Sequence, residues 1–152
     1  MDGAEWSEGE GFHRGFFSSF RIRAGKAVWF HVPFPTPTEL QGSATYLDAV
    51  SLLFETLDGA QINWMVLQHG GMERLPLTER LREPPAVDVP FDPPELWREY
   101  YPASSRRLSV LPIRPRLPMQ FGVQLCVMVT APDAVDGLVR FYGAGVDFAD
   151  KA

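Results

Sequence analysis

Four polar side chains lie in or beside strongly apolar segments, where they could act as an acid, a base or an anion ligand. His69 ends one such segment and precedes Gly70-Gly71, so it can reach a ligand from a hinged turn. Arg140 and Tyr142 lie among apolar residues near the end of the chain, and an arginine in such surroundings needs a counter-ion or an anionic ligand. Glu55, in a different apolar segment, could supply that counter-charge. The candidate catalytic residues are therefore His69, Glu55, Arg140 and Tyr142.

Aromatic side chains form a second group, which could bind a ligand by stacking on it. Trp97, Tyr100 and Tyr101 lie in an irregular, proline-rich segment, where they either plug the core or line a pocket. The plug is favoured, because a proline-rich cover needs large anchors. His31 either hydrogen-bonds the proline-rich stretch that follows it, which is the favoured interpretation, or acts as a base. The candidate ligand-binding residues are Trp64, Trp97, Tyr100, Tyr101 and His31.

No sequence motif points to a cofactor or a metal. The chain has no phosphate-binding loop, no Gly-x-Ser-x-Gly, no His-Glu-x-x-His and no paired cysteines. Its three histidines, His13, His31 and His69, are not spaced as metal ligands, so we expect no metal site. Cys126 lies in an apolar run and is interpreted as a buried, inert thiol.

The charge and hydropathy of the chain exclude several classes of partner. Its net charge of −5 disfavours nucleic-acid binding, which needs a clustered basic surface. No apolar run approaches the roughly 20 residues that cross a bilayer, so no membrane partner is expected. The acidic N-terminus does not resemble a signal peptide, and together with the single cysteine it predicts a cytoplasmic protein.

Apolar and polar side chains alternate with a period of two along most of the chain, which predicts β-strands. Residues 26–32 are typical, with Trp29 and His31 on the face opposite to the apolar side chains. Asp58-Gly59 predicts a hairpin turn between two strands, and a helix over residues 46–57 is the less favoured alternative. Gly143 and Gly145 indicate a bulge or a close backbone approach in the last strand. The segments with this pattern are 16–23, 26–32, 46–57, 60–68, 120–130 and 138–148.

The middle of the chain breaks this pattern. Residues 76–118 hold ten of the fourteen prolines, so we expect no long ladder there but a covering loop. Asp92-Pro93 predicts the start of a short helix over Pro93–Tyr100. Leu108–Ile113 could form a short edge strand. The predicted fold is an all-β antiparallel two-layer sandwich or jelly-roll-like barrel, with a flexible arm at residues 1–15 and a single domain at 16–150.

Two strings of residues resemble an uncharacterised family of small microbial β-sandwich proteins. The string from Trp29 to Pro37, WFHVPFPTP, is similar to a Trp-Phe-His, Pro-x-Pro-Thr-Pro motif near the family's first strands. The string from Arg140 to Phe148, RFYGAGVDF, resembles its closing strand, which ends in Ala-Gly-x-Asp-Phe. The chain departs from the family at residues 69–72, where the family has an acidic Asp-Gly turn, and in the longer segment 76–118. The resemblance implies a β-sandwich and no known activity.

These observations support three hypotheses of function. The first is a non-enzymatic module that binds a small hydrophobic or carbohydrate-like ligand, or a protein partner, in a cleft capped by residues 76–118. The second is a cofactor-independent cyclase or isomerase of specialised metabolism, in which the four candidate catalytic residues converge on an enclosed apolar pocket. The third is assembly into a homodimer through the proline-rich edge and exposed aromatic residues.

Overall fold

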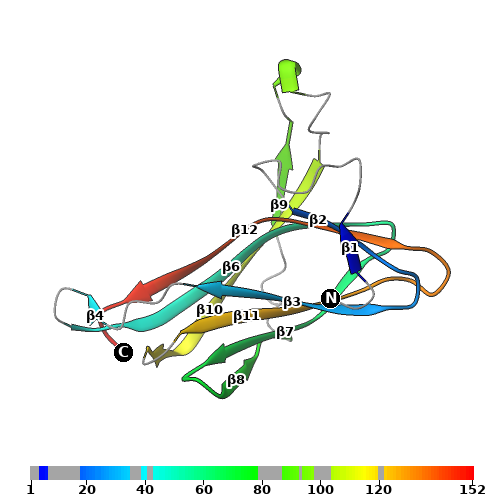
Figure 1. The fold of residues 1–152 in the computed structure, drawn as a ribbon. Coiled ribbons are helices and arrows are strands. Elements are labelled where there is room, and N and C mark those ends of the chain that lie inside the picture. Colours follow the sequence, from blue (N-terminus) through cyan, green and yellow to red (C-terminus); the bar gives the residue numbers. More distant parts are fainter. Residues whose placement is uncertain are drawn as a thin grey trace.

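Two antiparallel sheets pack face to face in the computed structural model (Figure 1), which describes residues 4–6, 18–34, 39–40, 43–78, 87–92, 94–97, 104–119 and 122–152. The larger sheet has six strands in the order β1 (Ala4–Trp6), β2 (Ser18–Ile22), β12 (Gly137–Ala149), β6 (Tyr46–Leu57), β10 (Ser104–Pro118) and β9 (Val87–Phe91). The smaller has four, in the order β3 (Ala27–Phe34), β11 (Val123–Thr130), β7 (Gln61–His69) and β8 (Glu73–Pro76). A two-stranded ribbon joins β4 (Glu39–Leu40) to β5 (Ser43–Ala44). The predicted all-β sandwich is confirmed.

The strands pair in a nested order along the chain. Eight of the ten strands in the two sheets form a nested set of antiparallel pairs: β2 with β12, β3 with β11, β6 with β10 and β7 with β8. Within this set the first strand, β2, pairs with the last, β12, and the pairing continues inward, which is the strand order of a jelly roll. Most connections between successive strands of this set therefore pass from one sheet to the other, whereas β7 and β8 are neighbours in the same sheet.

This winding overturns the predicted hairpin at Asp58-Gly59. The two residues do form a tight turn with positive φ, 55° and 82°, but β6 and β7 on either side of it belong to different sheets. The turn after β2 and the one after β11 cross between the sheets in the same way, and the Gly25 N–H donates to Pro132 O over 2.8 Å where these two turns meet. One end of the sandwich is thus closed by three crossing turns.

The hydrophobic core lies between the sheets and follows the predicted alternation. In β3, Val28 and Phe30 are buried while Trp29 and His31 are exposed. The core-facing residues of β11 alternate in the same way with residues of its other face. The largest fully buried side chains come from both sheets: Ile22, Leu47, Leu52, Met65, Leu67, Leu77, Leu111, Ile113 and Leu125.

A β-bulge in β12 between Phe141 and Gly143 reverses its alternation. Inward side chains carry odd numbers before the bulge and even numbers after it, as Val139 and Val146 illustrate. Gly145 comes so close to β6 that a Cβ there would lie 3.1 Å from a serine hydroxyl oxygen. The bulge and the close approach predicted from the two glycines are both confirmed.

The proline-rich middle of the chain contains a long strand instead of an irregular cover. The strand β10 is 15 residues long; Arg107–Pro112 and Leu117–Pro118 pair with β6 on one side, and Ser104–Leu108 pair with β9 on the other. The prolines of β10 all come after Leu108, the last residue of β10 that pairs with β9, so on that side no described strand needs the N–H that proline lacks. On the other side, the ladder to β6 shifts register between Pro112 and Leu117. The strand predicted at Leu108–Ile113 is present, but it is part of the much longer β10.

Two smaller predictions also differ from the structure. In place of a helix over Pro93–Tyr100 there is one 3₁₀ turn, Glu95–Trp97; Pro93 and residues 98–100 lie outside the described residues. Of the arm predicted at residues 1–15, the structure describes only Ala4–Trp6, which form a strand against β2. In the described part of the chain, no helix has the length and apolar character needed to cross a membrane.

An ion-pair cluster around Asp48 joins β6, β10 and the end of the chain. Arg116 Nε lies 2.7 Å and Arg114 Nη1 2.8 Å from Asp48 Oδ1. Arg116 also donates to Lys151 O over 3.1 Å. The hydrogen bond from Arg116 lowers the pKa of Asp48 most, and the charges of both arginines lower it further, against desolvation.

The Asp48 cluster should make the fold sensitive to acid. Because the folded pKa lies below the ordinary value of 3.8, the contribution to stability is complete above that pH and is lost as the pH falls through the folded pKa. Asp48→Asn should therefore lower Tm by a constant amount from pH 7 to about pH 5, and by less below about pH 4. Thermal unfolding followed against pH measures the difference. A difference that persists unchanged at the lowest pH would contradict the assignment.

The closed end of the sandwich gives a second prediction. A Cβ on Gly59 would lie 2.6 Å from Pro132 Cγ, whereas on Gly70, which also has positive φ, the nearest atom would be 4.0 Å away. Gly70→Ala should cost about 1 kcal/mol for its backbone conformation alone. Gly59→Ala should cost a further 1–3 kcal/mol, roughly, for the clash. Urea unfolding of both variants checks this, and equal losses would contradict it.

Candidate functional site

The outer face of the four-stranded sheet presents side chains that the core does not use. Strand pairing arranges them in rows across the sheet, because residues directly opposite each other in a ladder share a face. Met128 of β11 lies between Trp29 and Trp64 in one row, and Cys126 lies between His31 and Val66 in the next. In the third row Gln124 is followed by Gln68 and Arg74. Four strands therefore build one continuous surface.

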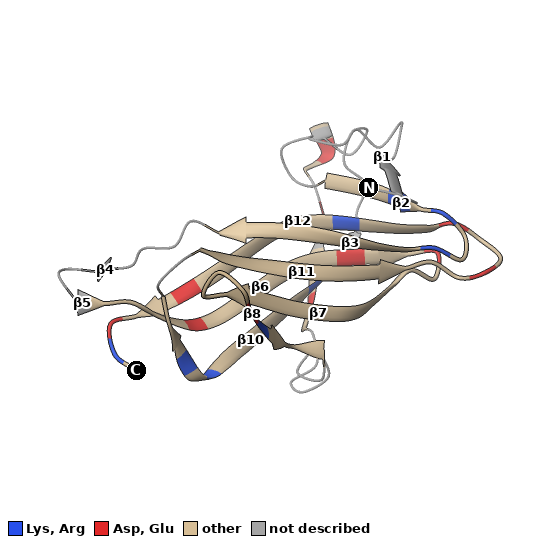
Figure 2. Ribbon diagram, turned by 60° about the horizontal axis from the view of Figure 1, so that its bottom comes forward, with Lys and Arg blue, Asp and Glu red and all other residues tan. Residues whose placement is uncertain are grey.

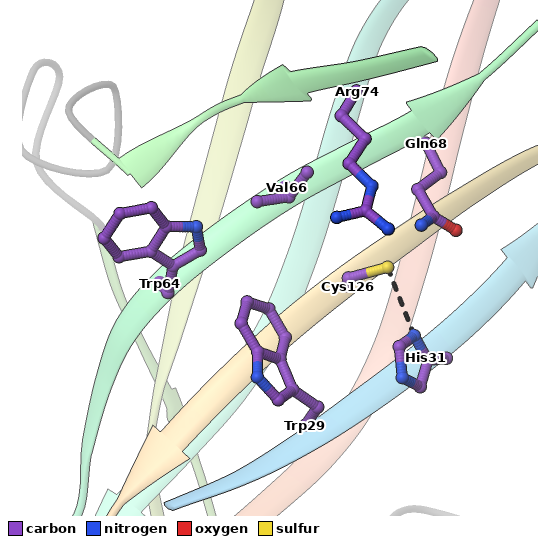
Figure 3. A pocket seen from close by; sticks show the side chains of 7 residues that line it. All are labelled: Trp29, His31, Trp64, Val66, Gln68, Arg74 and Cys126. Atoms are coloured by element: carbon purple, nitrogen blue, oxygen red, sulfur yellow. Dashed lines mark hydrogen bonds between the residues drawn. The ribbon is translucent and has the colours of Figure 1, made fainter. Parts of the chain in front are cut away.

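A pocket of about 480 Å³ lies on this face. Its lining has two ends, with Trp29 and Trp64 at one and Arg74, Gln68 and His31 at the other (Figure 3). Between them lie the small side chains of the central strands. The complete lining is Trp29, His31, Trp64, Val66, Gln68, Arg74 and Cys126.

The two tryptophans are held on rigid strands yet remain open to water. Trp29 is 39% and Trp64 48% exposed. A bulge in β7 at Asn63 lets Ile62 turn into the core while Trp64 stays outside, because Met128 pairs with Trp64 and the next residue of β11 pairs with Ile62. Asn63 Nδ2 fixes the bulge by donating to a threonine hydroxyl of β11 over 2.6 Å. Large apolar rings held in this way are typical of a binding surface.

His31 and Cys126 form a hydrogen-bonded pair at the polar end of the pocket, with 3.2 Å between Nδ1 and Sγ. Burial raises the pKa of the Cys126 thiol, against a smaller opposite effect of the Arg74 charge. The thiol therefore keeps its proton at neutral pH and can donate it to Nδ1, which is a better acceptor than sulfur. In the tautomer in which Nδ1 accepts from the thiol, the ring proton lies on Nε2, and the exposed His31 then offers an N–H donor to a ligand.

The surroundings of this pocket carry almost no charge. β3, β7 and β11 contain no Lys, Arg, Asp or Glu, and Figure 2 shows β7 and β11 entirely in tan. On β8, Glu73 lies on the same side as the core-packed Leu75, whereas Arg74 lies on the outer side. Among the strand residues that the structure describes, Arg74 is the one charged side chain on the outer face of this sheet.

Two of the five predicted ligand-binding residues, Trp64 and His31, line the pocket. The side chain of Trp97 and all of Tyr100 and Tyr101 lie outside the described residues. The structure gives His31 a hydrogen bond with Cys126; residues 35–38 of the proline-rich stretch, its predicted partner, lie outside the described residues.

Sequence reasoning missed Trp29, Gln68 and Arg74 as site residues. The alternation along residues 26–32 did place Trp29 outside, but nothing in it showed which strands are neighbours. Arg74 lies in a four-residue strand, β8, which is too short to show a period.

The predicted catalytic residues divide between the two sheets. Arg140 Nη1 donates to Glu55 Oε1 over 2.8 Å, and the Tyr142 hydroxyl donates to the same oxygen over 3.5 Å. The pairing of Arg140 with Glu55 is thus confirmed. These residues lie on the outer face of the six-stranded sheet, where Arg106 covers the Tyr142 ring at 5.4 Å.

His69 lies apart from this cluster. It ends β7 in the other sheet, at the far end from the turn that follows β6. The convergence that the enzyme hypothesis requires therefore fails for this residue. No group of three or more His, Cys, Asp or Glu side chains in the described ranges could hold a metal ion.

No family model matches the chain, and neither a curated protein nor a solved structure matches it. The resemblance in the first and last strands stays a prediction.

The buried ion pair gives a prediction that separates a structural from a catalytic role. The side chains of Arg140 and Glu55 are 8% and 6% exposed. Arg140→Met should cost about 3–5 kcal/mol, because it removes the guanidinium charge that balances the buried Glu55 carboxylate. Glu55→Leu combined with Arg140→Met should cost well below the sum of the single variants. Urea unfolding of the three variants measures the coupling, and additive losses would show that the pair does not act as a unit.

Proposed function

We propose that the protein is a binding module that holds a pyranose sugar against Trp29 and Trp64, on the outer face of its four-stranded sheet. The observation that carries this proposal is the pair of half-exposed tryptophans on either side of Met128. Exposed indole rings on rigid strands are unfavourable in water, so their presence calls for something that covers them.

The spacing of the two rings suits a sugar. Two steps across a sheet separate β3 from β7, which amounts to about 10 Å. A pyranose ring has an apolar face of C–H groups that can stack on an indole, and a rim of hydroxyls. Two rings at this distance can hold adjacent sugar units, or the two sides of one ligand.

The polar end of the pocket suits the hydroxyl rim. Gln68 offers a carbonyl acceptor and an amide donor, and His31 offers an N–H donor. Arg74 adds several donors in a fixed plane. A mostly apolar lining with a few polar groups is the usual composition of a small-molecule site.

This proposal moves the binding site away from the predicted cleft under residues 76–118. The described parts of that segment include β9 and β10, which belong to the six-stranded sheet. A protein partner, including a second copy of the chain, would cover the same tryptophans. Binding of a protein partner, unlike binding of a sugar, would greatly increase the mass of the particle in solution, which light scattering detects.

The proposal predicts that binding depends on both tryptophans. Oligosaccharides of glucose, xylose, galactose and their uronic acids, titrated into the protein, should quench or shift its tryptophan fluorescence. Trp29→Ala and Trp64→Ala should each weaken the binding at least about fivefold, as for a central aromatic contact.

Val110→Ala is the matched control. Val110 is 45% exposed, much like Trp64, but lies on the outer face of the other sheet. The proposal is wrong if no sugar of the panel binds, or if the tryptophan variants bind like the control. A dimer that either tryptophan variant abolishes would assign the face to a second copy instead.

A further inference from the structure

We infer that the sugar bound at this face carries a carboxylate, so that the ligand class is a hexuronic acid or a glycan that contains one. The inference rests on the proposed function and adds to it the chemical group that the polar end of the pocket selects.

Arg74 supplies the first argument. It lines the pocket, and no carboxylate of the described residues forms a salt bridge with it. Other described arginines that face outward, such as Arg114, Arg116 and Arg140, are paired with an acid. A guanidinium placed in an otherwise uncharged site favours an anion, and its planar fork matches a carboxylate in particular.

The pocket lining supplies the second argument. No Asp or Glu lines the pocket, and the side chains beside Arg74 can both donate a hydrogen bond. His31 presents Nε2–H in the tautomer in which Nδ1 accepts from Cys126, and Gln68 lies directly opposite Arg74 in the ladder. An anionic group at this end would meet three donors and no like charge.

The arrangement of the two ends supplies the third argument. The tryptophans and the donors lie at opposite ends of one pocket (Figure 3), with Val66 and Cys126 between them. The carboxylate of a hexuronate projects from the rim of the pyranose ring. Such a sugar can therefore stack its face on an indole while its carboxylate points along the sheet toward Arg74.

The test uses two sugars that differ only at this group, methyl β-D-glucuronide and methyl β-D-glucoside. Their affinities for the full chain are measured by NMR titration at low ionic strength, where charge–charge attraction is least screened. The glucuronide should bind about tenfold more tightly, the ratio that one charge-assisted hydrogen-bonded contact supplies. Arg74→Gln should reduce this ratio to about one, and Arg74→Lys should keep only part of it.

Arg21→Gln is the control, because it removes the same charge from an exposed arginine on the outer face of the six-stranded sheet. It should leave the ratio unchanged. Equal binding of the two sugars, lost in Trp64→Ala, would overturn this inference and leave the proposed function intact. Failure of both sugars and of the oligosaccharide panel would overturn both.

A third sugar, methyl β-D-glucoside 6-sulfate, separates carboxylate recognition from a general preference for anions. Tighter binding of the sulfate than of the glucuronide would overturn the assignment to a carboxylate. The same order of affinities in Arg74→Gln would show that Arg74 does not make the selection.

Discussion

The packing of one sheet against the other determines the face on which every side chain of the four-stranded sheet lies. Val28, Leu125 and Leu67 must point inward to fill the core, so their neighbours along each strand must point outward. This constraint exposes the indole rings of Trp29 and Trp64 to water, which is unfavourable, and no contact within the described part of the fold offsets that exposure. The candidate site is thus the outer counterpart of the core on β3, β7 and β11, to which β8 adds Arg74.

Much of the fold could be predicted because the alternation is a local property. The strand at residues 26–32, the inward face of residues 120–130 and the bulge near Gly143 all follow from neighbouring residues. The pairing of Glu55 with Arg140 was also within reach, since a charge in an apolar strand requires a partner. Each of these inferences depends on a few residues that are close in the chain.

What could not be predicted depends on contacts between distant segments. Asp58-Gly59 has the conformation of a tight turn whether the strands beside it pair or pass to opposite sheets, so the dipeptide cannot distinguish the two. The prolines of β10 suggested an irregular segment because their tolerance depends on a neighbouring strand ending at Leu108. Trp29 and Trp64 become parts of one site only once β11 lies between them. Alternation shows a residue's face but not its neighbours.

The nested pairing has a consequence for how the chain acquires its structure during synthesis. β12 is the last described strand to leave the ribosome, yet it lies between β2 and β6 in the middle of the larger sheet. β1 and β2, although made first, have no larger sheet to join until β12 has been translated. Pairings between strands far apart in the chain are slow to form, because the entropy of closing a long loop is lost before the contacts that offset it are made. The N-terminal strands therefore keep unpaired edges for the longest time during synthesis, and a chaperone that binds them would prevent the most aggregation.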